Sequence, residues 1–371
     1  MNNKALHIVS LDVPFPADYG GAIDIYYRIK ALHELGFKIT LHCFEYGRGK
    51  HKELDRITAC VNYYKRKKRV FDLFGGKPFI VETRSTNALL QNLLQDDAPI
   101  LFEGLHTTFF LADGRLKNRV KLVRTHNVEH QYYNGLADKA TGLKRLYFRN
   151  EARKLKKFEK ILKNADHILT IQKNDFDHFS SLHKSVYLLN ASAPENNIDE
   201  YVETEPYCLF HGNLSVPENN TAAFWMLETF KQNPSIPLII AGKDPSKMLA
   251  HKCTQQGVTL KANPDTEKMN VLLGNARVHV FYTDQPTGLK LKLITALQTS
   301  GHVVVTPEMT EGTTLEILCA VAAKRSSFSK QILKLFPKQL THEDFLSRRK
   351  HIDKNYNTKK NCEIIAQLID D

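Results

Sequence analysis

Apolar and polar positions divide the 371-residue chain into alternating segments of two kinds. Short apolar or β-branched runs are typical of buried strands, and longer stretches with an apolar residue every three or four positions are typical of amphipathic helices. In the first half the pattern predicts a helix over 22–36 and strands over 6–13, 38–44, 99–105, 119–125, 167–172 and 186–190. In the second half it predicts helices over 222–230, 245–256 and 266–276 and strands over 207–214, 236–243, 258–262, 278–282 and 302–306.

Strands that alternate with helices through short loops indicate parallel, doubly wound α/β sheets. Residues 191–205 interrupt the alternation with a polar stretch, so we expect a linker there with one sheet on each side of it. A chain of this length also exceeds the size at which a single hydrophobic core stops growing. The sequence therefore predicts two Rossmann-like domains, over residues 1–195 and 196–340, followed by a helical tail over 341–371.

One segment of the second half, residues 287–306, carries candidate chemistry. Its pattern predicts a glycine turn at Gly288, a short helix with Lys290 and Lys292 in its first turn, and a buried strand. Lysines at a helix N-terminus face the positive end of the helix dipole, which is unfavourable unless an anion binds both the lysines and the free backbone N–H groups. We therefore expect this segment to bind the diphosphate of a nucleotide.

In each half the first predicted strand leads into a glycine-containing loop that precedes a helix. Gly20 and Gly21 lie in the first loop, and Gly212 and Asn213 lie in the second. Neither loop matches the G-x-G-x-x-G or Walker A sequence. Because ligands of open α/β sheets bind at the carboxyl ends of the strands, we expect the two domains to face each other with one glycine loop on each wall of a cleft.

The excess of 52 basic over 40 acidic residues, a net charge of +12, is concentrated in two places. The first is a run of five residues, Lys65, Arg66, Lys67, Lys68 and Arg69. The second holds ten basic residues between Lys139 and Lys163, and its apolar spacing predicts an amphipathic helix with a basic face. Such a face binds an anionic membrane surface or stays solvated, and both interpretations remain open. No nucleic-acid-binding module accompanies the charge, so no nucleic acid is expected as a partner.

The cellular compartment follows from the apolar runs and the cysteines. No apolar run approaches the roughly 20 residues that span a bilayer. The first run contains His7, Ser10 and Asp12 and lacks a small-residue cleavage site, which favours a buried strand over a signal peptide. The six cysteines are scattered without a C-x-x-C pair, which favours reduced thiols over a zinc knuckle. We expect a cytoplasmic protein, and the membrane interpretation of the basic segments would place it at the inner face of the cell membrane.

Several motifs, in this order and spacing, resemble one protein family over nearly the whole chain. They are GGA at 20–22, FEGLHT at 102–107, RTHNVEHQYY at 124–133, ADHILTIQKND at 165–175, FHGNLSVPENN at 210–220, LIIAGKDP at 238–245 and the segment 287–306. The chain resembles retaining glycosyltransferases of the GT-B fold, close to glycosyltransferase family 4. The resemblance implies an acceptor-side first domain, a second domain that binds a nucleotide-diphosphate sugar, a tail that packs back on the first domain, and no metal ion or other cofactor.

The resemblance also implies roles for the residues at matching positions. Lys290 and Lys292, together with His106 near the sugar, would be catalytic, because loss of the nucleotide diphosphate needs positive groups on the departing phosphates. The donor-binding set would be Gly20, Gly21, Gly212, Asn213, Lys243, Thr287, Gly288, Thr295 and Glu311. The acceptor side would be formed by His126, Asn127 and Glu129. A structural histidine at 106 and a solvated lysine at 243 are the plainer alternatives.

The sequence departs from the family at two positions. The family usually places two glutamates eight residues apart around this segment, where this chain has Thr287 and Thr295. Threonine still hydrogen-bonds a sugar hydroxyl, but it is shorter and brings no negative charge. We expect the missing carboxylate from Glu308, Glu311 or Glu316, with Glu311 favoured, and altered donor preference or loss of activity are the alternatives.

The sequence HNVEH at 126–130 suggests a different chemistry. It matches the H-x-x-E-H pattern of inverted zinc peptidases, for which Glu151 or Glu159 would be a third ligand. The peptidase motif belongs inside a helix, whereas this one directly follows the strand predicted over 119–125, so we disfavour zinc.

The resemblance, together with the residues named above, implies a metal-independent glycosyltransferase of the hexosyltransferase type, acting on a lipid-linked or cell-surface glycan in polysaccharide biosynthesis. A nucleotide-sugar 2-epimerase and a non-catalytic sugar-binding subunit of a glycosyltransferase complex are the alternatives. The epimerase would process a free nucleotide sugar without an acceptor, and the subunit would bind ligand without turnover.

Overall fold

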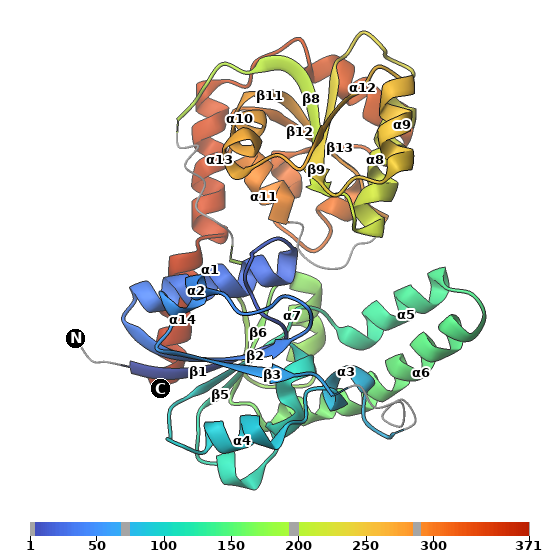
Figure 1. Ribbon diagram of the computed structural model, residues 1–371. Helices are drawn as coiled ribbons and strands as arrows, with labels where there is room; N and C mark the ends of the chain where they lie inside the picture. Colours follow the sequence, from blue (N-terminus) through green and yellow to red (C-terminus); the bar gives the residue numbers. More distant parts are fainter. Residues whose placement is uncertain (1–3, 68–74, 193–199, 285–290, 371) are drawn as a thin grey trace. The chain divides into compact units, whose positions relative to one another are not determined.

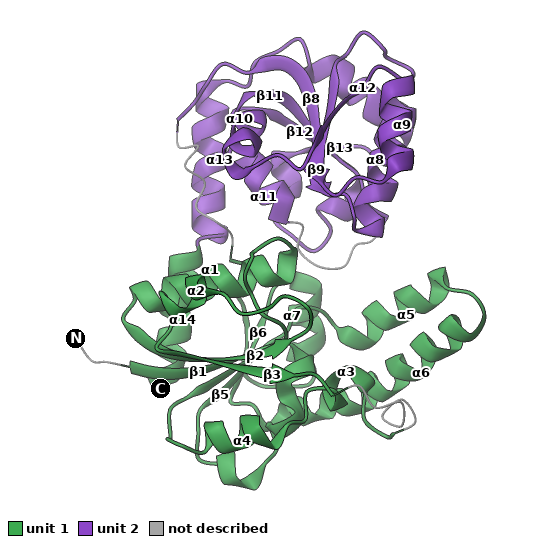
Figure 2. Ribbon diagram, viewed as in Figure 1, with its two compact units in different colours: residues 1–192, 287–289, 358–371 green, residues 193–286, 290–357 purple. Residues whose placement is uncertain are grey.

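The computed structural model describes residues 4–67, 75–192, 200–284 and 291–370. These residues form two compact units, which Figure 2 shows in different colours. Unit 1 contains the described residues of Met1–Ser192 together with Thr358–Asp371, and unit 2 contains those of Ala193–Pro286 and Lys290–Asn357.

Unit 1 alternates strands and helices along most of its length (Figure 1). Its strands are β1 (Lys4–Ser10), β2 (Phe37–Glu45), β3 (Cys60–Lys65), β4 (Ile100–Glu103), β5 (Lys121–Arg124), β6 (His167–Thr170) and β7 (Val186–Leu188). Its helices are α1 (Gly20–Glu34), α2 (Lys52–Asp55), α3 (Phe79–Glu82), α4 (Asn87–Leu93), η2 (Leu105–Phe110), η3 (Gly114–Leu116), α5 (Glu129–Lys139), α6 (Gly142–Phe158), η4 (Glu159–Asn164), α7 (Lys173–Ser180) and α14 (Thr358–Asp370).

The seven strands of unit 1 form one parallel sheet in the order β3-β2-β1-β4-β5-β6-β7. β1 pairs with β2 on one side and with β4 on the other, so the strand order reverses between β1 and β4. Ligands of open α/β sheets bind at such a reversal, outside the carboxyl ends of the two strands. The fold therefore directs attention to the residues that follow β1 and β4.

Alternating apolar residues bury both faces of this sheet. Leu6 and Ile8 of β1 belong to one cluster, which also contains the apolar sides of α1 and α14, and Val9 belongs to a second cluster with Phe102 and Leu155. From α14, Cys362, Ile365 and Leu368 enter the first cluster at helical spacing. The C-terminal helix therefore completes the core of unit 1.

Unit 2 repeats the same construction with six strands. Its strands are β8 (Glu205–Asn213), β9 (Leu238–Lys243), β10 (Thr259–Ala262), β11 (Ala276–Phe281), β12 (His302–Val305) and β13 (Ala320–Val321). Its helices are α8 (Pro217–Phe230), α9 (Lys247–Gln255), α10 (Thr266–Asn275), α11 (Leu291–Leu297), η5 (Pro307–Met309), η6 (Glu316–Leu318), α12 (Arg325–Leu335) and α13 (His342–Asn355). The sheet is parallel in the order β10-β9-β8-β11-β12-β13, so its order reverses between β8 and β11.

Several elements differ from the sequence-based prediction. The edge strand β3 was not predicted, because its residues CVNYYK mix polar and apolar positions. The tail predicted over 341–371 divides, since α13 belongs to unit 2 and only α14 to unit 1. The predicted linker begins inside unit 1, where Ser192 is buried and its N–H donates to Asp24 at 2.5 Å.

The basic segment 139–163 also differs in its burial. α6 and η4 cover most of it, but Leu143, predicted for the apolar face, is 84% exposed, whereas Leu155 is fully buried. The reason is that the first turns of α6 contact α5 rather than the sheet (Figure 1). None of the described helices is both long enough and apolar enough to cross a bilayer.

Candidate functional site

The glycines predicted for the first domain open α1, directly beside the strand reversal of unit 1. The first hydrogen bond within the helix runs from the N–H of Ile23 to the carbonyl of Tyr19, so the N–H groups of Gly20 and Gly21 have no partner inside the helix. Tyr19 provides no side-chain cap, and the first turn contains no acidic residue. A Cβ atom on Gly21 would lie 3.1 Å from the Tyr19 ring and 3.9 Å from Nδ1 of His126. The absence of a side chain at Gly21 therefore keeps this helix end accessible beside His126.

A chain of buried charges lies beneath His126. Its Nε2 is 3.1 Å from Glu103 Oε2, and Glu103 accepts from Arg28 Nε at 2.9 Å. Arg28 also donates to both oxygens of Asp24 at 3.1 and 2.8 Å, and Arg124 donates to Asp24 at 3.1 Å. None of these four charged side chains is more than 2% exposed. Because carboxylates and guanidinium groups are equal in number, each buried charge has an opposite partner and His126 is held in a fixed position.

The electrostatics of this buried network follow from its pairing. Burial would raise the pKa of Glu103, but Arg28 and the hydrogen bond with His126 outweigh burial and lower it. The pKa of Asp24 is lowered in the same way by Arg124 and Arg28. One oxygen or nitrogen atom from each of Asp24, Glu103 and His126 lies within 4.8 Å of the other two, a spacing at which three ligands can bind one metal ion. The guanidinium groups already supply the positive charge that these carboxylates need.

A second pair of side chains follows β4 and β5. His106, in η2 after Gly104, lies 3.5 Å from the carboxylate of Glu129, which opens α5. Glu129 is 2% exposed, and its Oε1 and the His106 Nδ1 have no hydrogen-bond partner among the described residues. Burial would raise the pKa of Glu129, but His106 and then His126 lower it. This edge therefore holds a buried carboxylate and an imidazole with capacity for further hydrogen bonds, as a polyhydroxyl ligand requires.

Asp175 of α7 joins this group, although the sequence reasoning did not select it. Burial raises the pKa of Asp175 to about 7; the hydrogen bond from the backbone N–H of Val128 lowers it by less, and the charge of Glu129 adds a smaller increase. Its Oδ2 also lacks a partner within the part of the chain that the structure describes. A carboxyl group that titrates near neutral pH at a strand edge is a feature of functional sites.

In unit 2, Lys292 lies at the equivalent place, where the strand order of the sheet reverses. Its Nζ donates to Asn219 Oδ1 at 2.8 Å, and it lies 5.4 Å from the ring centre of Phe210 and 5.7 Å from that of Phe281. Phe210 belongs to β8 and Phe281 to β11, the two strands between which the order reverses. Thr287, Gly288 and Lys290 lie outside the described residues. Of the predicted lysine pair, the structure therefore places Lys292 at the switch point of its sheet.

Gly212 lies beside this lysine, where β8 packs closely against β9 and the Asn219 side chain. A Cβ atom on Gly212 would lie 3.1 Å from the Asn219 side chain, and one on Gly242 would lie 1.8 Å from the Gly212 carbonyl oxygen. The neighbouring His211 is buried, and burial, followed by His279 and Lys292, lowers its pKa well below the ordinary value. His211 is therefore neutral at pH 7, so Lys292 provides the positive charge at this point.

Of the remaining residues predicted for donor binding, Asn213 and Lys243 are paired at the ends of β8 and β9, whereas Thr295 and Glu311 lie on other elements. Asn213 ends β8, where its Oδ1 accepts from the Ser215 N–H at 3.1 Å, and Lys243 ends β9 as an exposed side chain. Thr295 is half-buried on α11, and Glu311 is exposed in the loop after η5. A different carboxylate lies at the strand edge, because Glu218 Oε1 accepts from Thr283 Oγ1 at 2.7 Å.

The HNVEH motif does not form a peptidase site. His126 and Asn127 lie in the loop after β5, whereas Glu129 and His130 open α5. His126 contacts Glu103, while Nδ1 of His130 contacts Glu159 at 3.3 Å. Glu151 accepts from the N–H of Phe79 at 2.6 Å. The two histidines of the motif therefore have different partners, whereas two ligands of one metal ion would point toward the same ion.

The chain is similar in sequence to one curated protein and in fold to several solved structures. No family model matches the chain. Among curated proteins, an uncharacterized 44.6 kDa protein in the cps region of Klebsiella pneumoniae is 27% identical over 329 residues, which cover 82% of this chain and 84% of that protein. Among solved structures, TarM matches with a TM-score of 0.69 at 12% identity over 99% of both chains. WaaG, a glycosyltransferase involved in lipopolysaccharide biosynthesis, matches with a TM-score of 0.65 at 13% identity over 98% of this chain and 99% of that one.

The chain has the GT-B fold. HepE of Anabaena, solved in complex with UDP and glucose, shares this GT-B fold with a TM-score of 0.67 at 11% identity over 99% of this chain and 100% of that one. The predicted pair of parallel-sheet α/β domains is thereby confirmed. In this GT-B chain the residues that sequence reasoning missed are Asp24, Arg28, Glu103, Arg124, Asp175 and Glu218. Only Asp24 and Arg28 gave a signal, an acid and a base four residues apart in a helix that is otherwise largely apolar on its buried side.

Proposed function

We propose that this protein is a glycosyltransferase that moves a sugar from a nucleotide-diphosphate sugar to a glycan or lipid-linked acceptor. The observation that carries the proposal is Lys292, the positive charge at the strand reversal of unit 2, beside a glycine whose Cβ would fill the space next to Asn219. A cation at a switch point suits the diphosphate of a nucleotide. The HepE complex with UDP and glucose, and a TarM mutant complex that contains UDP, support this choice.

We assign the donor to the strand edge of unit 2. Lys292 would stabilise the charge that develops on the departing diphosphate, and its hydrogen bond with Asn219 keeps the ammonium group in position. Thr295 and Glu218 would hydrogen-bond the sugar or ribose hydroxyls, in place of the two glutamates of the family. The predicted roles of Lys290, Thr287, Gly288, Lys243 and Glu311 stay predictions.

We assign the acceptor to the strand edge of unit 1. Glu129 and His106 offer unused hydrogen-bonding atoms, and Asp175 adds a carboxyl group. Hydroxyl groups of a sugar both donate and accept, so they match a carboxylate and an imidazole. Gly20 and Gly21 would offer N–H groups of the α1 N-terminus to a phosphate of the ligand.

For the chemistry we propose retention without a metal ion. The bond between the anomeric carbon and the diphosphate oxygen breaks, and the acceptor oxygen bonds to the same face of the sugar. The acceptor proton passes to the oxygen of the departing phosphate, so the leaving group serves as the base. In this scheme the protein supplies positive charge and position, and no carboxylate nucleophile is required.

We further propose that the protein works at the inner face of the cell membrane, in the synthesis of a polysaccharide. The basic face of 139–163 and the basic run at 65–69 support an anionic membrane surface as partner. Of that run, Lys68 and Arg69 lie outside the described residues.

Thermal-shift measurements with UDP-, GDP-, ADP- and CMP-sugars test the donor assignment. One nucleoside-diphosphate sugar should stabilise the protein, and Lys292→Ala should weaken binding of that nucleotide roughly 10- to 100-fold, the value of one hydrogen bond to a charged group. Lys247→Ala, which removes an exposed lysine from α9, is the matched control and should leave binding unchanged. Stabilisation by none of the sugars, or equal stabilisation of Lys292→Ala, would contradict the proposal. Ligand binding without transfer to any acceptor would instead indicate a non-catalytic subunit.

A further inference from the structure

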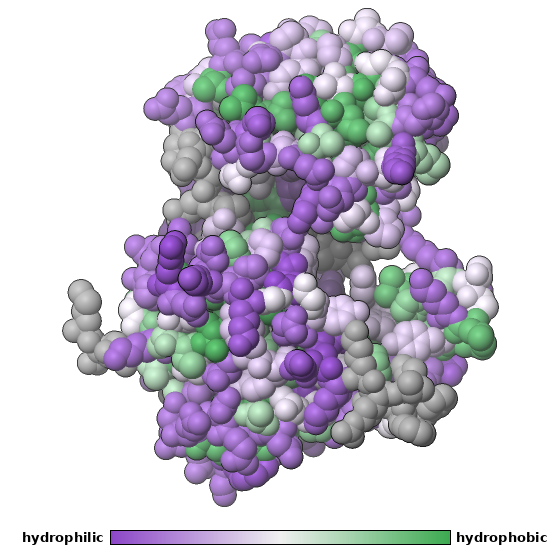
Figure 3. Space-filling model, in the orientation of Figure 1, coloured by the Kyte–Doolittle hydropathy of each residue, from purple (hydrophilic) through white to green (hydrophobic). Residues whose placement is uncertain are grey.

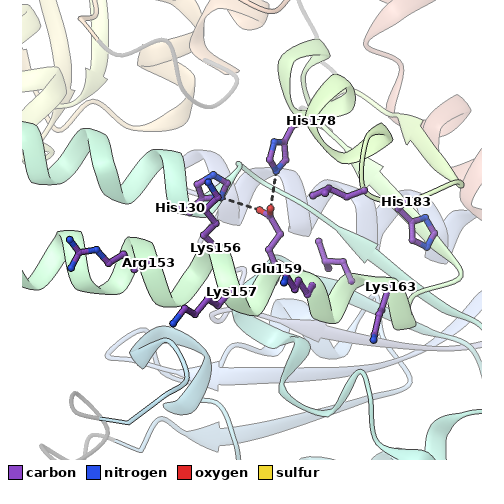
Figure 4. A pocket seen from close by; sticks show the side chains of 11 residues that line it. His130, Arg153, Lys156, Lys157, Glu159, Lys163, His178 and His183 are labelled. Atoms are coloured by element: carbon purple, nitrogen blue, oxygen red, sulfur yellow. Dashed lines mark hydrogen bonds and ion pairs between the residues drawn. The ribbon is translucent and has the colours of Figure 1, made fainter.

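A pocket of about 720 Å³ lies in unit 1, lined by residues of α6 and η4 and of α7 and the loop after it, with His130 of α5. Five basic side chains line it, Arg153, Lys156, Lys157, Lys160 and Lys163. Figure 4 shows its deeper wall, where the carboxylate of Glu159 lies between the rings of His130 and His178.

The basic side chains follow one face of a continuous helical segment. Their spacing along α6 and η4 repeats at three and four residues, which brings neighbouring charges together. Among the described residues, none of the five pairs with an acidic side chain, although Lys154 of the same helix pairs with Glu151 at 2.9 Å. Like charges at this spacing destabilise a helix by a few tenths of a kcal/mol per pair. An anionic ligand would relieve this repulsion.

The acidic residue of the pocket does not oppose an anion. Glu159 Oε1 is 3.3 Å from His130 Nδ1, and Oε2 is 2.9 Å from His178 Nε2, so both oxygens are engaged. Burial would raise the pKa of Glu159, but the hydrogen bonds with His130 and His178 outweigh it and lower the pKa. Each imidazole therefore donates a hydrogen bond to Glu159, so both oxygens of this carboxylate already have a partner in the wall of the pocket.

The same three side chains meet the spacing of a metal site, with ligand atoms within 4.8 Å of one another. A divalent cation there would replace two hydrogen-bonding protons and would lie among five positive side chains. The charge of the surroundings therefore favours an anion over a metal ion.

Apolar groups complete the pocket. Leu162 and Leu182 line it, and Leu182 is 56% exposed. Further along α6, Leu143 and Leu146 are 84% and 63% exposed, and Figure 3 shows apolar atoms gathered over the end of the α5–α6 hairpin. A pocket of this volume has room for much more than a phosphate group, and its lining suits a ligand with a charged head and an apolar body.

We propose that this basic pocket binds the phosphate group of an amphipathic phosphomonoester. The phosphate lies against Lys156 and Lys160, and the apolar part lies along Leu162 and Leu182. The proposal rests on the pocket alone and not on nucleotide-sugar chemistry.

Calorimetric titration with dioctanoyl phosphatidic acid tests the proposal, with UDP present in excess so that phosphate binding in unit 2 is blocked. Wild-type protein should bind the lipid, and Lys156→Ala/Lys160→Ala should bind it about 25-fold more weakly, at about fivefold for each lysine near an anionic lipid. Lys144→Ala/Arg145→Ala removes the same charge from α6 outside the pocket and should change the affinity less than twofold. All four side chains are exposed, so both variants should fold.

Two further titrations identify the source of the phosphate. Dioctanoyl phosphatidylcholine, which has no net charge, should not bind, and inorganic phosphate should bind more weakly than phosphatidic acid. Inorganic phosphate that binds as tightly as the lipid would refute the apolar part of the proposal. Equal weakening in both double variants would assign the binding to the general charge of α6 and overturn the pocket. One zinc ion bound per chain and lost in His178→Ala would overturn it in favour of a metal. The thermal-shift panel tests the donor assignment independently, so failure of lipid binding leaves that assignment unaffected.

Discussion

The buried charges beneath His126 give the most sharply defined prediction, the replacement Arg28→Met. Arg28 is 2% exposed and pairs with both Asp24 and Glu103. In the variant, Asp24 keeps Arg124 at 3.1 Å, but Glu103, which is fully buried, keeps only the imidazole of His126. Loss of one partner from a buried ion pair costs about 3–5 kcal/mol, because an unpaired charge remains in the interior. We expect unit 1 to lose this much free energy of unfolding at pH 8.

Native-state hydrogen exchange measures this loss within unit 1. Amides of β1 and β4 should exchange roughly 150-fold to several thousand-fold faster, the rate equivalent of about 3–5 kcal/mol. The loss should shrink as the pH falls from 8 to 5, because the unpaired, buried Glu103 of the native variant takes up a proton that the ionised Glu103 of the unfolded chain does not hold. The change is at most about 1.4 kcal/mol per pH unit for one proton. In the wild type the pKa of Glu103 is lowered, so its contribution is fully present above the unfolded pKa and disappears only in acid.

Two variants make this reasoning refutable. Arg28→Met/Glu103→Gln removes the orphan charge and should be more stable than Arg28→Met, although it carries one more substitution. Lys30→Met removes an exposed base from the same helix, where Lys30 is 3.8 Å from Glu34, and should cost less than about 0.5 kcal/mol. If Arg28→Met costs no more than Lys30→Met, or if the double variant is no better than the single one, the network does not stabilise unit 1 as argued.

Three further substitutions follow from single contacts. Asp175 has its pKa raised to about 7, so the native state keeps a proton that the unfolded state releases, and stability falls as the pH rises from about 4 to 7. Asp175→Asn should reduce the slope of the free energy of unfolding against pH over that window by up to about 1.4 kcal/mol per pH unit, as measured by urea unfolding. Equal slopes for the variant and the wild type would contradict this. Gly242→Ala should destabilise unit 2 by about 1–3 kcal/mol, because its Cβ would overlap the Gly212 carbonyl oxygen at 1.8 Å. The fluorescence of Trp225, the single tryptophan, reports on unit 2, and an unchanged midpoint would refute the overlap. Gly135→Ala, on α5 with open space around it, should instead stabilise the protein by up to about 1 kcal/mol, as amide exchange in α5 would show.

The sequence predicted the layered architecture well, because buried parallel strands carry a strong local signal. The predicted strands over 6–13, 99–105 and 278–282 each overlap an observed strand, β1, β4 and β11. Edge strands gave a weaker signal, since one side of an edge strand has no neighbour and its residues need not be apolar. Of the four edge strands, β7 and β10 were predicted, whereas β3 mixes polar and apolar positions and β13 has only two residues, so both were missed.

Burial along α6 shows a second limit of periodicity. A hydrophobic pattern states which side of a helix is apolar, but the length of helix that reaches the core depends on its neighbours. Leu155 and Leu162 reach the core, whereas Leu143 extends past it and stays exposed. The same helix buries Glu151, whose carboxylate accepts from the Phe79 N–H at 2.6 Å. The carboxylate of Glu151 is tolerated in the interior because it accepts a hydrogen bond from the backbone N–H of Phe79, which is distant in the sequence.

The candidate site shows why some functional positions follow from sequence and others do not. His106 and His126 directly follow predicted strands, so a rule about strand ends is enough to select them. Gly20 was selected from the glycine loop before a predicted helix, and Lys292 from its place in the first turn of another. The search for a carboxylate to replace Thr287 and Thr295 was restricted to neighbours in the sequence, and it favoured Glu311, which is exposed. The structure also brings a carboxylate from another part of the sequence to the strand reversal, since Glu218, in the first turn of α8, accepts from Thr283 at 2.7 Å across 65 positions of sequence. Strand order, which no local pattern encodes, decides which distant residues share a site, so the topology of the sheet had to be known before this carboxylate could be found.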